Sequence, residues 1–164
     1  MRILGIDPGS IATGYGIVEF SGSRLRYVDC GVIRTRGEDV GLRLASIHSR
    51  LAEVVRTHRP DEAALEAVFS ARNPRAALKL GQARGVALAV CGGAGLATAE
   101  YAPTSVKGAV TSYGRASKQQ VQSMVQRLLG LERPPASDAA DALAVAICHG
   151  AQSRTSADRA GASA

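Results

Sequence analysis

Four acidic residues stand where a charged side chain needs a particular reason. Asp7 and Glu66 each directly follow a short apolar run that is typical of a buried strand. A carboxylate at the end of such a strand is costly unless it is hydrated, paired or bound to a metal. Asp138 and Asp141 lie three residues apart in a helical pattern, so their side chains share one helical face. If the two strands are neighbours, Asp7 and Glu66 project into one crevice.

Converging carboxylates without His or Cys form the hard oxygen site that Mg²⁺ or Mn²⁺ prefers. Two such ions, about 4 Å apart, suit phosphodiester hydrolysis, because one lowers the pKa of the attacking water and the other stabilises the departing 3′ oxygen. We expect Asp7 to bridge the two ions. Asp138 also fits a plainer role, since the helix dipole stabilises an acid at a helix N-terminus. That explanation covers Asp141 less well.

The distribution of charge favours a polyanionic partner. The chain has a formal net charge of +6, but eight basic residues and one acid fall within residues 67–131. A basic block next to a cation site fits a surface that binds nucleic acid. The alternative is a solvated, arginine-rich helix surface. Lys107 and Lys118 stand out because the chain has three lysines against seventeen arginines, and a compact ammonium suits contact with a phosphate.

Two aromatic residues are further candidates for contact with DNA. Phe69 follows the Glu66 strand in a polar loop, where a ring could stack on an unpaired base; packing in the core is the alternative. Tyr113, in a basic loop, is a weaker candidate of the same kind. The expected DNA-binding residues are Phe69, Arg72, Lys107, Tyr113, Arg115 and Lys118.

Length and composition limit the architecture. A chain of 164 residues fits one domain with one core. It has no stretch of about 20 apolar residues that could span a bilayer and no signal-peptide pattern, so we expect a cytoplasmic protein. The three cysteines are widely spaced and read as reduced, buried thiols. We expect a domain over residues 1–150 and a disordered tail over residues 151–164.

Periodicity and turn signals place the elements that must position the carboxylates. Strands are predicted over 1–7, 13–20, 25–34, 61–66 and 96–99. Helices are predicted over 40–58, 74–90, 103–110, 118–129 and 138–149, with Asn73 and Ser117 as N-caps. The first three strands form an antiparallel unit, and later strands alternate with helices. This order predicts an α/β fold with a mixed five-stranded sheet flanked by helices.

These residues also carry a family resemblance. The chain resembles the RuvC family of Holliday-junction resolvases in the following segments: Ile6-Asp7-Pro8-Gly9-Ser10, Leu65-Glu66, Ala77 to Gly85, Lys118 to Val121, and Asp138-Ala139-Ala140-Asp141. The agreement covers nearly the whole chain up to His149. It departs at Ser112, where the family commonly has glycine, and after Gly150, where there is no family pattern.

The resemblance implies a ribonuclease-H-like fold and a homodimer that resolves four-way junctions by paired symmetric nicks, leaving 5′-phosphate and 3′-hydroxyl ends. It implies that Asp7, Glu66, Asp138 and Asp141 are catalytic metal ligands, for two Mg²⁺ ions that Mn²⁺ can replace. Lys107 and Lys118 match basic residues near the scissile phosphate. The RuvA and RuvB branch-migration proteins are the implied partners, in DNA recombination and repair. Gly81 and Gly85, four apart on one helix, fit either a two-fold interface or close packing on the chain's own sheet.

Alternatives from other classes stay open. The segment Gly5 to Ser10 also resembles the first phosphate loop of actin-like nucleotide-binding proteins, although those need two such domains. A non-catalytic junction-binding module would account for the basic block but leaves four metal-ready acids unexplained. Within the nucleases, an RNA-processing relative of the same fold is a third possibility.

Overall fold

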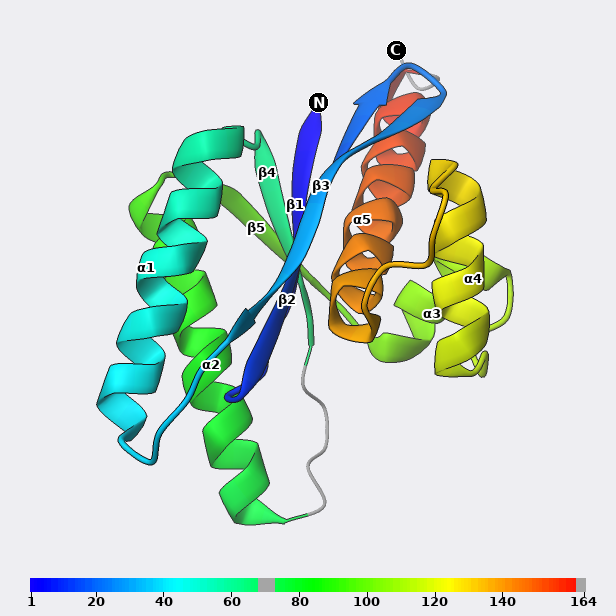
Figure 1. The fold of residues 1–164 in the computed structure, drawn as a ribbon. Coiled ribbons are helices and arrows are strands. Elements are labelled where there is room, and N and C mark those ends of the chain that lie inside the picture. Colours follow the sequence, from blue (N-terminus) through cyan, green and yellow to red (C-terminus); the bar gives the residue numbers. More distant parts are fainter. Residues whose placement is uncertain (68–72, 162–164) are drawn as a thin grey trace.

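The computed structural model describes residues 1–67 and 73–161, and its elements follow one another in the predicted order (Figure 1). Their bounds are β1 (Arg2–Asp7), β2 (Ala12–Ser21), β3 (Arg24–Arg34), α1 (Val40–His58), β4 (Glu62–Glu66), α2 (Pro74–Gly93), β5 (Ala97–Tyr101), α3 (Pro103–Thr111), α4 (Lys118–Leu129) and α5 (Ser137–Gly161). None of the helices in this described part is long and apolar enough to cross a lipid bilayer.

The strands form one five-stranded sheet in the order β3-β2-β1-β4-β5. The pairs β1–β2 and β2–β3 are antiparallel, whereas β1–β4 and β4–β5 are parallel. The predicted mixed sheet is therefore confirmed. Because β1 and β4 run in the same direction side by side, their carboxyl ends meet at one edge of the sheet.

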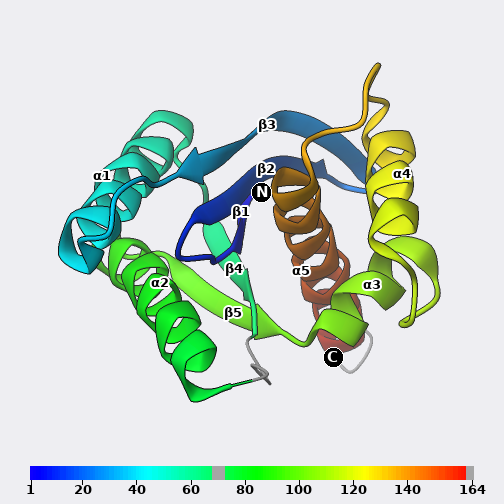
Figure 2. The ribbon, with the colours of Figure 1, turned by 60° about the horizontal axis from the view of Figure 1, so that its bottom comes forward.

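Helices cover both faces of the sheet, with α1 and α2 on one side and α3, α4 and α5 on the other (Figure 2). Side-chain alternation along β1 divides the core between the two faces. Leu4 and Ile6 pack toward the first pair of helices, while Ile3 packs in the cluster that includes the buried side of α5. Helix α5 is buried on nearly every side from Ala139 to His149.

Three strand glycines let α5 lie directly on the sheet. A Cβ on Gly5 would be 2.0 Å from the carbonyl oxygen of Ala142, and one on Gly16 would be 2.7 Å from the side chain of Leu143. A Cβ on Gly14 would be 1.9 Å from the carbonyl oxygen of Asp138. These distances are too short for any side chain, so glycine at these positions sets how closely the acid-bearing start of α5 approaches β1 and β2.

The predicted caps of α2 and α4 are confirmed. The side chain of Asn73 accepts a hydrogen bond from the backbone N–H of Ala76 at 2.8 Å. Ser117 and Gln120 form a reciprocal capping box at the start of α4. Because this box fixes the first turn of α4, it also fixes the backbone of Lys118, the first residue of the helix.

Helix α5 extends further than predicted. The predicted helix ends at His149, because the residues from Gly150 onward are small and polar, yet α5 continues to Gly161. Gly150 is a packing residue here, since a Cβ at this position would lie 2.1 Å from Cε2 of Phe20. One glycine inside a helix costs only about 1 kcal/mol relative to alanine and does not end it. The division into a domain over residues 1–150 and a tail over residues 151–164 remains a prediction.

Candidate active site

Two of the four acids end adjacent parallel strands. Ile6 of β1 pairs in register with Leu65 of β4, so the next residues, Asp7 and Glu66, stand beside each other at the edge of the sheet. The prediction that these two strands are neighbours is thus confirmed. Charged side chains are placed here because the strands leave the core at this point, and each acid is the last residue of its strand.

The start of α5 supplies the other two acids. Asp7 pairs across β1 and β2 with Gly14, and the missing side chain of Gly14 leaves room for the backbone of Asp138. The first turn of α5 is therefore held against the strand that carries Asp7. Asp141 follows one turn later on the same helical face.

A cavity of about 260 Å³ opens at this edge of the sheet. It is lined by Asp7, Glu66, Pro103, Val106, Lys107, Lys118, Val121 and Asp141. Three of the predicted carboxylates and both singled-out lysines thus share one cavity, although they come from five different elements. Asp138 does not line this cavity, but its charge acts on Asp7.

The cavity holds an excess of negative charge. Burial raises the pKa of Asp7 to about 7, and repulsion from Glu66, Asp141 and Asp138 adds to the rise, while Lys118 opposes it. The pKa of Glu66 is also raised, first by burial and then by Asp141. A neighbouring cation would relieve both effects, because it favours the ionised carboxylates.

The lysines are the positive groups that face these acids. Nζ of Lys118 donates to Oδ2 of Asp141 at 3.0 Å, and this contact is the main cause of the raised pKa of Lys118. The pKa of Glu66 is raised by burial and by Asp141, and Lys118 and Lys107 partly oppose that rise. The side chain of Lys118 is 71% exposed whereas that of Asp141 is 20% exposed, so the ammonium lies at the mouth of the cavity.

The donor set fits a hard divalent cation. Within residues 1–67 and 73–161, no three Asp, Glu, His or Cys side chains already enclose a metal position. The acids nevertheless converge as oxygen donors without sulfur or imidazole, and Asp7 is destabilised in its ionised form by burial and like charge. These are the features that Mg²⁺ or Mn²⁺ binding would satisfy.

Comparison with known proteins identifies the family. The family model described as "Crossover junction endodeoxyribonuclease RuvC" matches residues 3–149. The protein of that name from Burkholderia cenocepacia (strain HI2424) is 54% identical over 149 residues, which cover 91% of this chain and 83% of the relative. That from Shewanella sp. (strain MR-4) is 52% identical over 147 residues, covering 90% and 85%. The chain belongs to the RuvC family.

A solved structure supports the fold of this RuvC-family chain. The structure described as T. thermophilus RuvC in complex with Holliday junction substrate matches with a TM-score of 0.90 at 36% identity, over 95% of this chain and 96% of that one. The predicted ribonuclease-H-like fold is thereby confirmed. Nucleases of the RuvC family are metal-dependent, which agrees with the oxygen-rich cavity.

Two residues that were not predicted from the sequence hold the turn after Asp7. Thr13 and Thr35 are buried polar side chains. The hydroxyl of Thr13 donates to the carbonyl of Gly9 at 2.8 Å, and the hydroxyl of Thr35 donates to the carbonyl of Ser10 at 2.9 Å. They fix the turn between β1 and β2, and hence the end of the strand that carries Asp7. Thr13 was within reach of sequence reasoning as a polar residue beside the Asp7 turn, but Thr35 lies 25 residues from Ser10.

The other predicted contact residues lie apart from the carboxylates or outside the described chain. Tyr113 is 57% exposed and lines a separate groove of about 580 Å³ between the α3–α4 loop and α4. Arg115 is exposed on the same loop. Phe69 and Arg72 lie outside the described residues.

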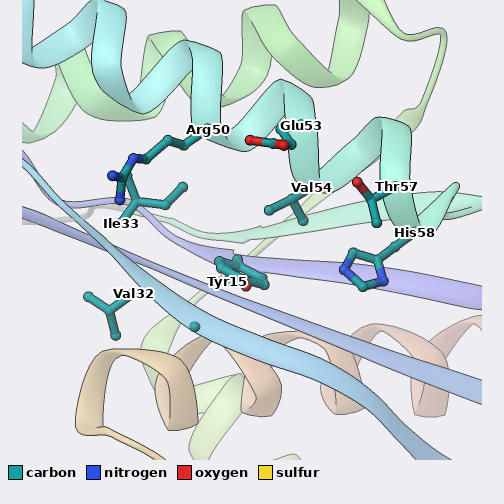
Figure 3. A pocket seen from close by; sticks show the side chains of 9 residues that line it. Tyr15, Val32, Ile33, Arg50, Glu53, Val54, Thr57 and His58 are labelled. Atoms are coloured by element: carbon teal, nitrogen blue, oxygen red, sulfur yellow. The ribbon is translucent and has the colours of Figure 1, made fainter.

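A second cavity, of about 520 Å³, lies between α1 and strands β2 and β3 (Figure 3). Tyr15 and His58 line it, and both contact Oδ2 of Asp29, at 3.3 and 3.0 Å. Tyr15 packs with the core cluster of the α1–α2 face, which is opposite to α5. Glu53 is the one acid among its lining residues, so this cavity does not offer the converging carboxylates of the site in this RuvC-family chain.

Proposed function

We propose that this RuvC-family chain resolves four-way DNA junctions by metal-dependent phosphodiester hydrolysis, with Asp7, Glu66, Asp138 and Asp141 as the metal ligands. Its family consists of crossover junction endodeoxyribonucleases, and its T. thermophilus structural relative is described in complex with Holliday junction substrate. The observation that carries the proposal is the convergence of acids from three elements beside Lys107 and Lys118. A non-catalytic binding module or a nucleotide-binding protein gives no reason for that arrangement.

The preferred metal is Mg²⁺, with Mn²⁺ as a substitute, and two ions fit the number of carboxylates. When bound, such ions would supply an activated water and stabilise the departing 3′ oxygen. We propose Asp7 as the central metal ligand because the charges of all three other acids act on its carboxylate. Its ionised form, which is unfavourable in the metal-free cavity, is the form that binds a cation.

The two lysines are proposed to act on the DNA phosphates. Asp141 must exchange its contact with Lys118 in order to hold a metal ion. The released ammonium, at the mouth of the cavity, is then free to bind a phosphate oxygen of the scissile strand. Lys107 already lines the cavity from α3 and opposes the rise in the pKa of Glu66, so it is proposed to contact phosphates of the same DNA strand.

The DNA surface is proposed to extend beyond the cavity. Tyr113 and Arg115 project from the loop that joins α3 to α4, and both of these helices line the cavity. An exposed ring next to a guanidinium suits stacking on a base together with contact to its phosphate. Phe69 and Arg72 stay predictions of the same kind, as the residues that follow the Glu66 strand.

A homodimer is proposed across α2. Leu78, Gly81 and Gly85 share one helical face, and Leu78 is 65% exposed. Within residues 1–67 and 73–161, a Cβ on either glycine would meet nothing within 4 Å, so these glycines do not serve packing on the sheet of this chain. A shallow apolar face suits a second copy of the same helix, and two-fold symmetry matches a junction with two equivalent strands to cut.

The cellular setting follows from the proposed reaction. We expect the chain to act in the cytoplasm on nucleoid DNA, in recombination and repair. The RuvA and RuvB branch-migration proteins are the proposed partners.

The reaction is tested by the chemistry of its products. Purified protein with Mg²⁺ or Mn²⁺ should nick a synthetic four-way junction in two strands of like polarity, and DNA ligase should reseal the nicks. Resealing requires the 5′-phosphate and 3′-hydroxyl ends that the mechanism leaves. Junction binding without nicks in either metal would instead support the non-catalytic module, and nicks that ligase cannot reseal would contradict the proposed direction of bond cleavage.

A further inference from the structure

A buried histidine joins α5, which carries Asp138 and Asp141, to β4, which carries Glu66. His149 of α5 is 7% exposed and, with Thr13 and Thr35, completes the buried polar residues of the described chain. Its Nδ1 lies 2.8 Å from the hydroxyl of Tyr101 on β5. Its Nε2 lies 2.6 Å from Oε2 of Glu62 on β4. The imidazole therefore bridges one helix and two strands.

The neutral imidazole with its hydrogen on Nε2 satisfies all three side chains. In that tautomer the hydroxyl of Tyr101 donates to Nδ1, and Nε2–H donates to the carboxylate of Glu62. The two rings are tilted by 55° with their centroids 5.7 Å apart. A partly buried polar chain in which each contact supports the next restrains the geometry of the groups that it joins.

This network reaches the catalytic edge through the backbone. Tyr101 pairs in register with Glu66 at the ends of β5 and β4. The carbonyl of Tyr101 also accepts the N–H of Ala67 at 2.8 Å, directly after Glu66. One residue thus holds the strand end that presents Glu66 and, through its hydroxyl, the helix that presents Asp138 and Asp141.

Close packing already sets the distance between α5 and the sheet, because Ala142 and Ala146 lie against the bare backbone of Gly5. Apolar contact is non-directional, whereas hydrogen bonds are directional and short. The hydrogen bonds of His149 therefore add a directional restraint on the position of α5 along the sheet.

We infer that Glu62, His149 and Tyr101 are positioning residues that set the spacing between the α5 acids and the strand acids. The inference rests on the proposed metal role of the four carboxylates. It assigns to these three residues an effect on metal binding and turnover that runs through Asp138 and Asp141, by holding α5 in place. Junction binding by the DNA surface is not part of that effect.

The test compares the Mg²⁺ concentration for half-maximal junction cutting among variants. Tyr101→Phe keeps the ring and removes one hydrogen bond, and Glu62→Ala removes the other. Each should raise the Mg²⁺ midpoint or lower kcat by about tenfold, the scale seen when a supporting contact of a metal ligand is lost. Junction affinity, measured in Ca²⁺ without cutting, should stay within about twofold. Glu62→Gln keeps an acceptor oxygen and should restore the wild-type midpoint.

A destabilised control separates positioning from folding. Leu51→Ala removes a fully buried side chain of α1 on the other face of the sheet, so it should lower Tm without moving the Mg²⁺ midpoint. A folded Tyr101→Phe variant with a wild-type midpoint and kcat would overturn the inference, as would Leu51→Ala shifting the midpoint equally. Full cutting by Asp141→Asn would instead overturn the proposed carboxylate site, so the two failures are distinguishable.

Discussion

At the scale of single residues, the fold places Asp7 where its ionised form is unfavourable. Burial and three neighbouring acids raise its pKa from 3.8 to about 7. A carboxyl whose folded pKa exceeds its unfolded value binds its proton more tightly in the folded state. The folded state is therefore favoured at low pH, and that advantage is lost as the pH rises from about 4 to 7. At pH 8 without metal, the ionised side chain opposes folding.

We accordingly predict that Asp7→Asn stabilises the metal-free protein at pH 8. The amide carries no charge to bury, so the free energy of unfolding should rise by on the order of 2 kcal/mol. At pH 4 the variant and wild type should differ little, because folded Asp7 is protonated there and carries no charge to bury. Urea unfolding at both pH values measures the difference. A variant that is less stable than wild type at pH 8 would contradict the proposal that ionised Asp7 destabilises the metal-free fold.

The raised pKa of Asp7 should also make the Mg²⁺ dependence of the reaction vary with pH. Binding of a cation requires ionised Asp7, so the apparent Mg²⁺ affinity should rise with pH up to about 7 and then level off. A Mg²⁺ titration of junction cutting between pH 6 and pH 8 checks this. A midpoint that does not change over that range would show that Asp7 does not limit metal binding.

At the scale of elements, the position of α5 on the sheet determines whether the four acids converge. Gly14 lies where any Cβ would be 1.9 Å from the carbonyl oxygen of Asp138. The nearest atoms are all backbone atoms of Asp138 and Ala139, so a change of side-chain rotamer cannot relieve the contact. The start of α5 must move instead, and with it the acids that face Asp7.

We predict that Gly14→Ala abolishes junction cutting while junction binding persists. The strain should also lower the free energy of unfolding by about 1–3 kcal/mol. Gly92→Ala is the matched control, because a Cβ at Gly92 meets nothing within 4 Å, and it should cut like wild type. The measurements are nicking rates and gel-shift affinities of the same preparations. Wild-type cutting by Gly14→Ala would refute the role given to α5 packing.

The elements themselves were largely predictable because their signals are local. Asn73 followed by Pro74, and Ser117 three residues before Gln120, mark helix starts within a few residues of sequence. The end of α5 was not predictable, because Gly150 looks like a stop until Phe20, 130 residues away, is seen against it. Sequence patterns report what a residue favours on its own and not what it later packs against.

The site was predictable to the same extent. Asp7 and Glu66 drew attention as charges that end apolar strands, and the helical spacing of Asp138 and Asp141 is visible in the sequence. The pairing of Lys118 with Asp141 was not, nor was the bridge from His149 to Tyr101. Those contacts join elements that are adjacent only after the sheet has formed.

At the scale of the whole molecule, the proposed homodimer would contain two copies of the cavity, related by a two-fold axis. The exposed face of Leu78, Gly81 and Gly85 is the part of α2 opposite to its buried residues, among them Ala83 and Ala87. A symmetric pair of nicks needs both cavities on one junction. A monomer with an intact cavity could cut one strand but would not couple the second cut to the first.

We predict that Gly81→Leu yields a folded monomer. A Cβ at Gly81 has no atom of the described residues within 4 Å and points into open space, so Tm should change little, whereas a close approach of two α2 helices would be blocked. Sedimentation velocity measures the mass, and Gly92→Ala serves again as the control. A Gly81→Leu variant that stays dimeric would place the interface elsewhere.

The proposed function depends most on Asp7 being a metal ligand for catalysis rather than a residue needed for folding or DNA binding. A synthetic mobile four-way junction incubated with Mg²⁺ and either wild type or Asp7→Asn tests this directly. We predict paired symmetric nicks by wild type, with linear duplex spared, and junction binding of undiminished affinity without nicks by the variant. Equal cutting by Asp7→Asn, or equal cutting of linear duplex by wild type, would contradict it.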